Sequence, residues 1–140
     1  MEIVLRAALI TWLRADPALA ALNAIAEEAP NRTSLPWLGL VASASTDWST
    51  KDRAGREIRI ALELQARGDD PLSAADLVTA VEERIAAFPP DLSSEPLGER
   101  PAFRIINCRF LRARAEQRSH NRRAVLLEYR FRCLAYGDSA

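Results

Sequence analysis

Apolar side chains recur with helical spacing in two segments of the chain. Residues 2–14 contain no glycine or proline, and their apolar side chains form two adjacent i, i+4 rows. Residues 72–88 carry a similar apolar stripe. We therefore predict two main helices, over 2–14 and 72–88. Asp16 and Pro17, a favoured N-cap followed by a favoured first helical residue, predict a short helix over 18–23.

Strand patterns occupy four further segments. Residues 56–67 alternate between apolar and polar side chains, which is typical of a half-buried antiparallel strand. Residues 37–48 begin with apolar side chains at both parities, which favours a strand that is covered on both faces or buried against another protomer. Residues 102–115 and 123–136 are both extended and flank a polar tip at 118–121, so we predict a long hairpin.

The register of this long hairpin depends on its turn. A two-residue turn at His120-Asn121 would pair residues whose numbers sum to 241. We prefer this register because it places the bulky apolar side chains of both strands on one face. In that register Cys108 faces Cys133. We interpret the two thiols as reduced core residues, with a redox pair as the alternative.

The order of elements is therefore α, short α, β, β, α, β, β. Runs of strands without βαβ alternation predict an α+β fold, with an antiparallel sheet of about four strands and two main helices packed on one face. Residues 25–35 have the composition of a polar connector, and the proline-containing segment 89–101 that of a long loop. A chain of 140 residues suits a single domain over 1–140.

Composition narrows the class of protein. The chain is 49% hydrophobic and 27% charged, as soluble globular proteins are. No apolar run approaches the roughly 20 residues that a membrane span needs, and the first residues lack the pattern of a signal peptide. We therefore expect no contact with a membrane.

The net charge of zero hides a polarised distribution. Residues 1–99 carry 9 basic and 16 acidic side chains, whereas residues 100–132 carry 10 arginines and only 2 glutamates. Arginine supplies 18 of the 19 basic residues, and its planar fork suits interfaces. Either the base composition of the genome or contact with a second copy, another protein or phosphates would explain this pattern.

The sequence offers no chemistry that assembles an active site. His120 lies at a hairpin tip, where it lacks a pocket and an orienting partner. The five glycines are scattered, so no phosphate-binding loop exists, and two cysteines with one distant histidine match no metal-ligand spacing. We expect no enzyme activity, no cofactor and no metal.

The arginine-rich hairpin raises the alternative of a nucleic-acid-binding protein. Ten arginines within 33 residues would attract phosphates. However, no aromatic stacking platform and no recognition helix accompany them. Protein–protein contact between the basic hairpin and an acidic N-terminal portion is the favoured interpretation.

Short hydrophobic signatures recur through this order of elements and span nearly the whole chain. They lie at Leu13–Leu22, Leu35–Leu38, Asp47–Lys51, Gly55–Glu57, Ala75–Ala87, Asn107–Phe110 and Leu127–Arg132. In these signatures the chain resembles the phage tail-completion family, the tail terminator proteins of long-tailed phages and of phage-derived gene transfer agents. Residues 23–35 depart from the family pattern, because they lack the aromatic-proline strand that is expected there.

The resemblance implies a structural role in the neck of a virion or phage-like particle, assembled in the bacterial cytoplasm. Such proteins form a ring, typically a hexamer, on the head-proximal end of the tail tube. The ring stops polymerisation of the tube protein and presents its other face to the head-connector or stopper protein, and DNA passes through its lumen without sequence-specific binding. A chain with polarised charge suits such a closed head-to-tail assembly. The alternative is a small oligomeric module that binds a ligand or nucleic acid.

Two polar hairpin connections and the arginines near them are the candidates for contacts with ring neighbours, tube or stopper, although both connections also suit ordinary solvated turns. The candidate interface residues are Trp48, Lys51, Arg53, Arg56, Arg112, Arg114, Arg118, His120, Arg122 and Arg123. We expect reversal of the charges of Arg112, Arg114 and Arg118 to disrupt assembly and to leave the fold intact.

Overall fold

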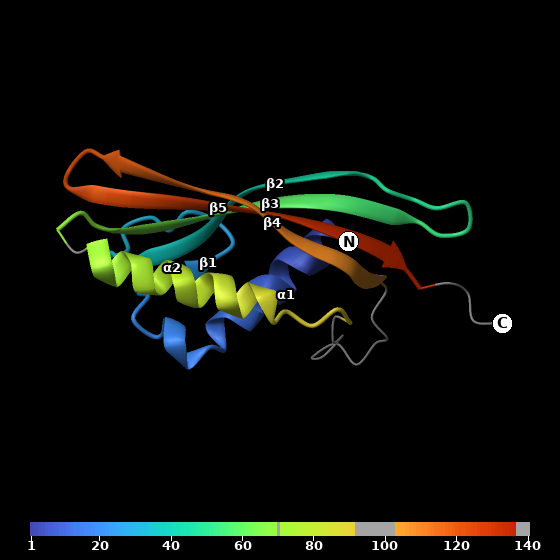
Figure 1. The fold of residues 1–140 in the computed structure, drawn as a ribbon, viewed down its shortest axis with the longest axis horizontal. Helices are drawn as coiled ribbons and strands as arrows, with labels where there is room; N and C mark the ends of the chain where they lie inside the picture. The colour runs from blue at the N-terminus through green and yellow to red at the C-terminus, as the bar shows by residue number, and fades with distance from the viewer. Residues whose placement is uncertain (70, 92–102, 137–140) are drawn as a thin grey trace.

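A computed structural model describes residues 1–69, 71–91 and 103–136, which fold into a layer of helices against a sheet (Figure 1). In chain order the elements are α1 (Glu2–Arg14), the 3-10 helix η1 (Pro17–Leu19), β1 (Ile25–Ala26), β2 (Trp37–Asp47), β3 (Gly55–Arg67), α2 (Pro71–Ala86), β4 (Phe103–Arg118) and β5 (Arg122–Ala135). The predicted α+β class, the two main helices and the four main strands are confirmed. The short helix is a 3-10 turn, and the Asp16 side chain caps it by accepting a hydrogen bond from the Ala18 amide at 3.0 Å.

The sheet has five strands in the order β1-β2-β3-β5-β4. The predicted antiparallel sheet of about four strands corresponds to β2, β3, β5 and β4, and one further strand makes the sheet mixed. The additional strand β1 lies in the segment predicted to be a connector, and it pairs in parallel with β2. The Leu38 amide donates to the Ala24 carbonyl at 2.9 Å, and the Asn23 amide donates to the Pro36 carbonyl at 2.8 Å. A two-residue strand held by its backbone is too short to show any alternation in the sequence.

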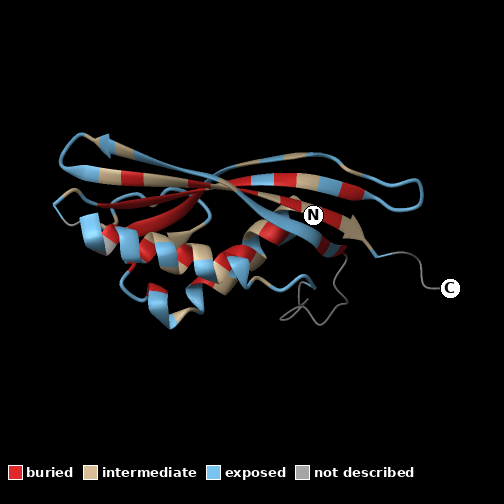
Figure 2. Cartoon of the chain, viewed as in Figure 1, coloured by how far each residue is buried: buried red, intermediate tan, exposed pale blue. Residues whose placement is uncertain are grey.

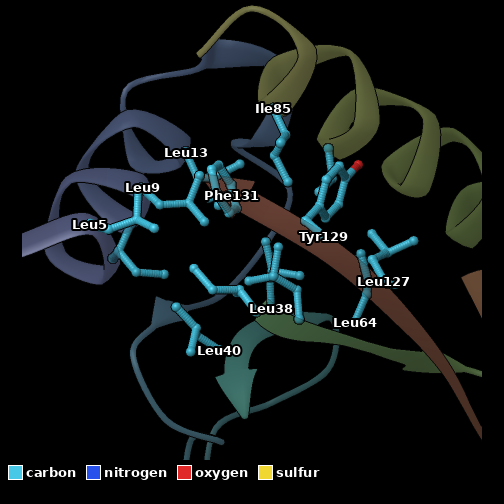
Figure 3. Packing of buried hydrophobic residues seen from close by; sticks show 14 of the residues in the cluster. Leu5, Leu9, Leu13, Leu38, Leu40, Leu64, Ile85, Leu127, Tyr129 and Phe131 are labelled. Carbon is cyan, nitrogen blue, oxygen red and sulfur yellow. The ribbon is translucent and has the colours of Figure 1, made fainter. Parts of the chain in front are cut away.

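The core lies between the helices and one face of the sheet. Leu5, Leu9 and Leu13 of α1 are fully buried and pack near Phe131 of β5 (Figure 3). Ile85 of α2 belongs to the same cluster. The buried stripe of each helix is turned toward the sheet (Figure 2). The helical periodicity of the sequence therefore identifies the core face of both helices.

A reciprocal contact fastens α1 to α2. The Trp12 indole donates to the Arg84 carbonyl at 2.7 Å, and the Arg84 guanidinium donates back to the Trp12 carbonyl at 2.9 Å. The guanidinium carbon also lies 3.4 Å from the centroid of the Trp12 ring. Phe88 packs edge-on against that ring at a centroid distance of 6.1 Å. Arg84 is consequently an internal contact of the helix layer.

The first residues of β2 are buried on both sides of the sheet, as its pattern predicts. Leu38 and Leu40 face the helices, whereas Trp37 and Gly39 face the opposite side. A Cβ on Gly39 would lie 2.9 Å from the Glu28 carbonyl oxygen, so the segment after β1 crosses the outer side of the sheet at this point. The cover on both faces is therefore intramolecular.

The predicted register of the β4–β5 hairpin is wrong. The turn contains three residues, with His120 and Asn121 at φ of 62° and 54°, so pairing starts at Arg118 and Arg122. Two bulges in β4 then shift the register further, between Ile105 and Asn107 and between Phe110 and Arg112. The prediction assumed one constant register, whereas the three-residue turn shifts the pairing by one residue and each bulge adds one unpaired residue to β4.

In the observed register the two cysteines are not directly paired. Cys108 pairs with Phe131, and Cys133 pairs with Ile105. Cys133 is buried, as predicted, but Cys108 is exposed, so its assignment to the core is wrong. Beyond Ile105, β4 extends past the cover of the helices and leaves Phe110 46% exposed. Most of the predicted loop 89–101 lies outside the described residues.

Candidate assembly surface

The outer face of the sheet, turned away from both helices, carries most of the charge of β3, β5 and β4. Ile58, Ile60 and Leu62 of β3 face the core, so Glu57 and Arg59 alternate to the outer face. Side chains at paired positions point to the same face of a sheet. The residues of β5 that pair with Glu57 and Arg59 therefore also face outward, and so do the residues of β4 that pair with those of β5. The outer face is therefore a charged surface that extends across three strands.

Intramolecular ion pairs cover part of this face. The Arg112 guanidinium pairs with Glu128, and that ion pair lowers the pKa of the Glu128 carboxyl. The Arg132 guanidinium donates to Glu57 at 3.1 Å. The remaining pairs on this face are Arg114–Glu116 at 2.9 Å, Arg118–Glu116 at 3.2 Å and Arg130–Glu57 at 3.8 Å. Several predicted interface arginines thus already have partners within the chain.

Arg118 has a further partner that is buried. Its Nη2 lies 2.6 Å from a carboxylate oxygen of Glu63, whose side chain is only 8% exposed. The Gln65 amide donates to the other Glu63 oxygen at 3.3 Å. The chain that crosses at Gly39 lies over the same side of the sheet as Glu63. Arg118 therefore balances a buried charge, and this role within the fold was not evident from the sequence.

Three arginines stand side by side across the middle of the outer face. Arg59 of β3 pairs with Arg130 of β5, and Arg130 pairs with Arg109 of β4. We call these three residues the arginine row. Like charges in directly opposed positions destabilise a sheet. Among the described residues, Glu57 lies 3.8 Å from Arg130 and Glu128 attracts Arg59, and the Nε of Arg130 is buried without a hydrogen-bond partner.

The β2–β3 connection, at one end of the sheet, holds four predicted interface residues. Lys51, Arg53 and Arg56 are exposed, and Trp48 is half-buried with the Arg132 guanidinium 5.4 Å from its ring centroid. A Cβ on Gly55 would lie 2.5 Å from the Trp48 carbonyl oxygen and 2.9 Å from that of Cys133, so the close approach of the backbone requires glycine. This packing fixes the base of the connection.

The opposite end of the sheet holds the β4–β5 turn with four more of the predicted residues. His120 and Arg122 are exposed and line an open hollow of about 320 Å³ together with residues 33–35. The Arg123 guanidinium donates to the Gly68 carbonyl at 2.9 Å, so it ties the turn to the end of β3. Arg118, described above, completes this group. The turn is thus a solvent-exposed projection with a fixed base.

The structure does not bring the predicted residues together. The two connections lie at opposite ends of β3 (Figure 1), and a strand of 13 residues is about 40 Å long. Arg112 and Arg114 lie between them on the outer face. The candidate residues therefore form three separate groups along the sheet, which suits contacts with different neighbours. Whether these residues form interfaces stays a prediction.

The solvent side of α2 has the opposite charge. Asp76 and Glu83 are exposed, and they lie on one stripe because seven residues make about two helical turns. Arg84, the basic residue of α2, is engaged with Trp12. The two layers of the molecule thus present basic and acidic patches in opposite directions.

One open depression lies beside residues 14–26 and has a volume of about 640 Å³. Residues 1–69, 71–91 and 103–136 contain no group of three or more side chains suited to hold a metal ion. Within the same part of the chain, no helix is long and apolar enough to cross a membrane.

Sequence reasoning did not single out the arginine row. Arg59, Arg109 and Arg130 are ordinary polar positions of alternating strands, and their proximity depends on a register that includes both bulges of β4. The only signal available was the density of arginine in residues 100–132.

This fold has a counterpart among solved virion structures. A chain of the structure described as "Virion of native gene transfer agent (GTA) particle" is 25% identical, with a TM-score of 0.75. The match covers 94% of this chain and 95% of that chain. No curated protein matches the sequence significantly. The class that the fold defines is therefore that of virion structural proteins.

The sequence itself identifies the family. Residues 7–134 match the family model described as "Tail completion protein gp17". The chain therefore belongs to the tail completion protein gp17 family, and it is a structural protein of a phage-type tail. The resemblance proposed from the short sequence signatures is confirmed.

Proposed function

We propose that this protein forms a ring, built from six copies, that caps the head-proximal end of the tail tube. The ring stops polymerisation of the tube protein and joins the tube to the head-connector or stopper protein. DNA passes through its lumen without sequence-specific recognition. The observation that carries this proposal is the family match over residues 7–134, together with a likeness to a virion chain over nearly the full length.

The shape and charge of the molecule support an assembly subunit. A closed ring of identical copies needs two different patches on each copy, because each interface is head-to-tail. The outer face of the sheet and the solvent side of α2 are two such patches. The two hairpin connections project from opposite ends of the sheet (Figure 1), so they suit contacts with the tube on one side and the stopper on the other.

The alternative of a nucleic-acid-binding module has weaker support. Arg112, Arg114 and Arg118 pair with carboxylates of the same chain, and Arg123 binds a backbone carbonyl. These contacts reduce the positive charge that the hairpin offers to phosphates.

Measurement of mass in solution tests the proposal. We expect light scattering to find six times 15.5 kDa, or about 93 kDa, for the protein alone, or a larger complex with tube protein that contains six copies of this chain. The control is the tube protein alone. A monomer of 15.5 kDa at every concentration, both with and without tube protein, would contradict the ring.

A further inference from the structure

We propose that the ring interface forms when the acidic solvent side of α2 in one copy binds the arginine row of the next copy. The partner is thus a second copy of this chain, and the contact is head-to-tail. This inference rests on the proposed function, because it assigns two surfaces to the ring described above.

The arginine row lacks the carboxylates that its charge requires. Arg59 and Arg109 are exposed, and neither forms an ion pair with any described residue. Arg130 shares the single carboxylate of Glu57 with Arg132, and its buried Nε has no acceptor. Glu57 and Glu128, which also pair with Arg132 and Arg112, offset the repulsion between these three adjacent guanidinium groups only in part. Acidic groups from outside the chain would reduce this repulsion further.

The acidic patch on α2 matches the row in charge and in spacing. Asp76 and Glu83 are seven residues apart, which corresponds to about 10 Å along a helix. Arg59 and Arg109 are two strands apart, which corresponds to about 9.6 Å across a sheet. A helix that crosses the strands of the next copy would therefore bring one carboxylate to each end of the row.

The surface around the row leaves room for a helix. Ala44 is the register partner of Arg59 on β2, and Ala61 follows Arg59 on the same face of β3. Small side chains at these positions allow a close approach of a second backbone. The patches cannot meet within one copy, because α2 lies on the opposite side of the sheet (Figure 1). They can meet only between copies, and such contacts between unlike patches generate a ring when the rotation closes.

Carboxylates of a second copy fit the row better than a nucleic-acid backbone does. Glu57 and Glu128 lie in the register positions on either side of the row, so acidic groups border it along the direction of the strands. A continuous run of phosphates that follows the strands would pass over at least one of these glutamates and be repelled. Two separate carboxylates about 10 Å apart, as on α2, would avoid both.

Charge exchange between the two patches tests this interface. In R59E/R109E the row becomes acidic, and in D76R/E83R the helix becomes basic. Each variant alone then has two patches of the same charge, so it should lose ring formation, with association weakened by at least about 100-fold. When the two variants are mixed, acidic rows meet basic helices and basic rows meet acidic helices. The mixture should form rings with alternating copies in a 1:1 ratio.

A matched control separates this effect from a general loss of charge. Arg32 and Arg67 are also exposed, and they lie outside both patches and outside the candidate interface residues. The variant R32E/R67E has the same change in charge and should retain the ring. Circular dichroism should show unchanged secondary structure in all variants, and R59Q/R109Q provides a milder change that should also weaken the ring.

The outcomes distinguish this inference from the proposed function. If wild-type protein forms rings and R59E/R109E forms them equally well, the interface is wrong and the ring stands. If rings persist but R59E/R109E loses affinity for a short DNA duplex measured by fluorescence anisotropy, the row binds phosphates and the interface is likewise overturned. If wild-type protein forms no ring with or without tube protein, the proposed function itself fails.

Discussion

At the residue scale, the ion pair between Arg112 and Glu128 makes a prediction about pH. The hydrogen bond from Arg112 lowers the pKa of the Glu128 carboxyl below its usual value of 4.5. A carboxyl whose pKa is lowered by folding contributes stability above its unfolded pKa, and it loses this contribution as the pH falls through the folded pKa.

We therefore expect an NMR titration to give a pKa below 4.5 for Glu128 in the native protein. In Arg112→Gln the value should rise, because the largest cause of the shift is removed. The stability difference between the two proteins should be present at pH 7 and vanish in the acidic range in which Glu128 is protonated. An identical Glu128 titration in both proteins would contradict this assignment.

Arg118 allows a second prediction, because its charge balances the nearly buried carboxylate of Glu63. The sequence alone led us to expect that charge reversal here would leave the fold intact. Given the 2.6 Å contact, we now expect Arg118→Glu to lower the free energy of unfolding by about 3 kcal/mol. Chemical denaturation would measure this loss, with the exposed Arg122→Glu as the control. Equal stability of the two variants would refute the role of the contact.

The two cysteines should differ in reactivity. Desolvation raises the pKa of both thiols to about 11, so each is protonated at neutral pH. We expect a thiol reagent at pH 8 to modify the exposed Cys108 slowly and to modify the buried Cys133 only after unfolding. Mass spectrometry of digested samples distinguishes the two sites. Formation of a native disulfide between them, or equal labelling of both in the folded protein, would contradict the register of the hairpin.

At the element scale, the contact between Trp12 and Arg84 fastens the two helices. Trp12→Phe removes the indole N–H and leaves the Arg84 carbonyl without this donor. Arg84→Lys retains the charge but loses the planar group that stacks on the ring. We expect each change to cost about 1–2 kcal/mol of unfolding free energy, and we expect the double variant to cost less than the sum. Strict additivity in thermal denaturation would show that the two side chains do not act as a unit.

The helices and strands also show which parts of the fold can be predicted from sequence periodicity. The two main helices and four main strands follow from periodicity, because burial of one face imposes that periodicity on many residues at once. The strand β1 and the hairpin register could not be predicted in this way. The first depends on backbone hydrogen bonds of two residues, and the second depends on a three-residue turn and two single-residue bulges.

At the scale of the whole molecule, features that follow from a sequence pattern could be predicted, and features of the site that depend on strand register could not. The family was evident from sequence signatures spread over the chain, and residues 7–134 confirm it. The residues at the two connections could be singled out because polar turns stand out between strands. The arginine row could not, because adjacency across three strands is a property of the register. Sequence therefore indicated the kind of protein, whereas the distribution of charge over its two layers required the structure.

The central claim is that the assembled protein closes one end of a tail tube. Electron microscopy of tubes polymerised with and without this protein tests it most directly. We predict a ring at one end of each tube and no further growth from that end when fresh tube protein is added. Continued growth at both ends, or protein bound along the side of the tube with neither end closed, would contradict the account.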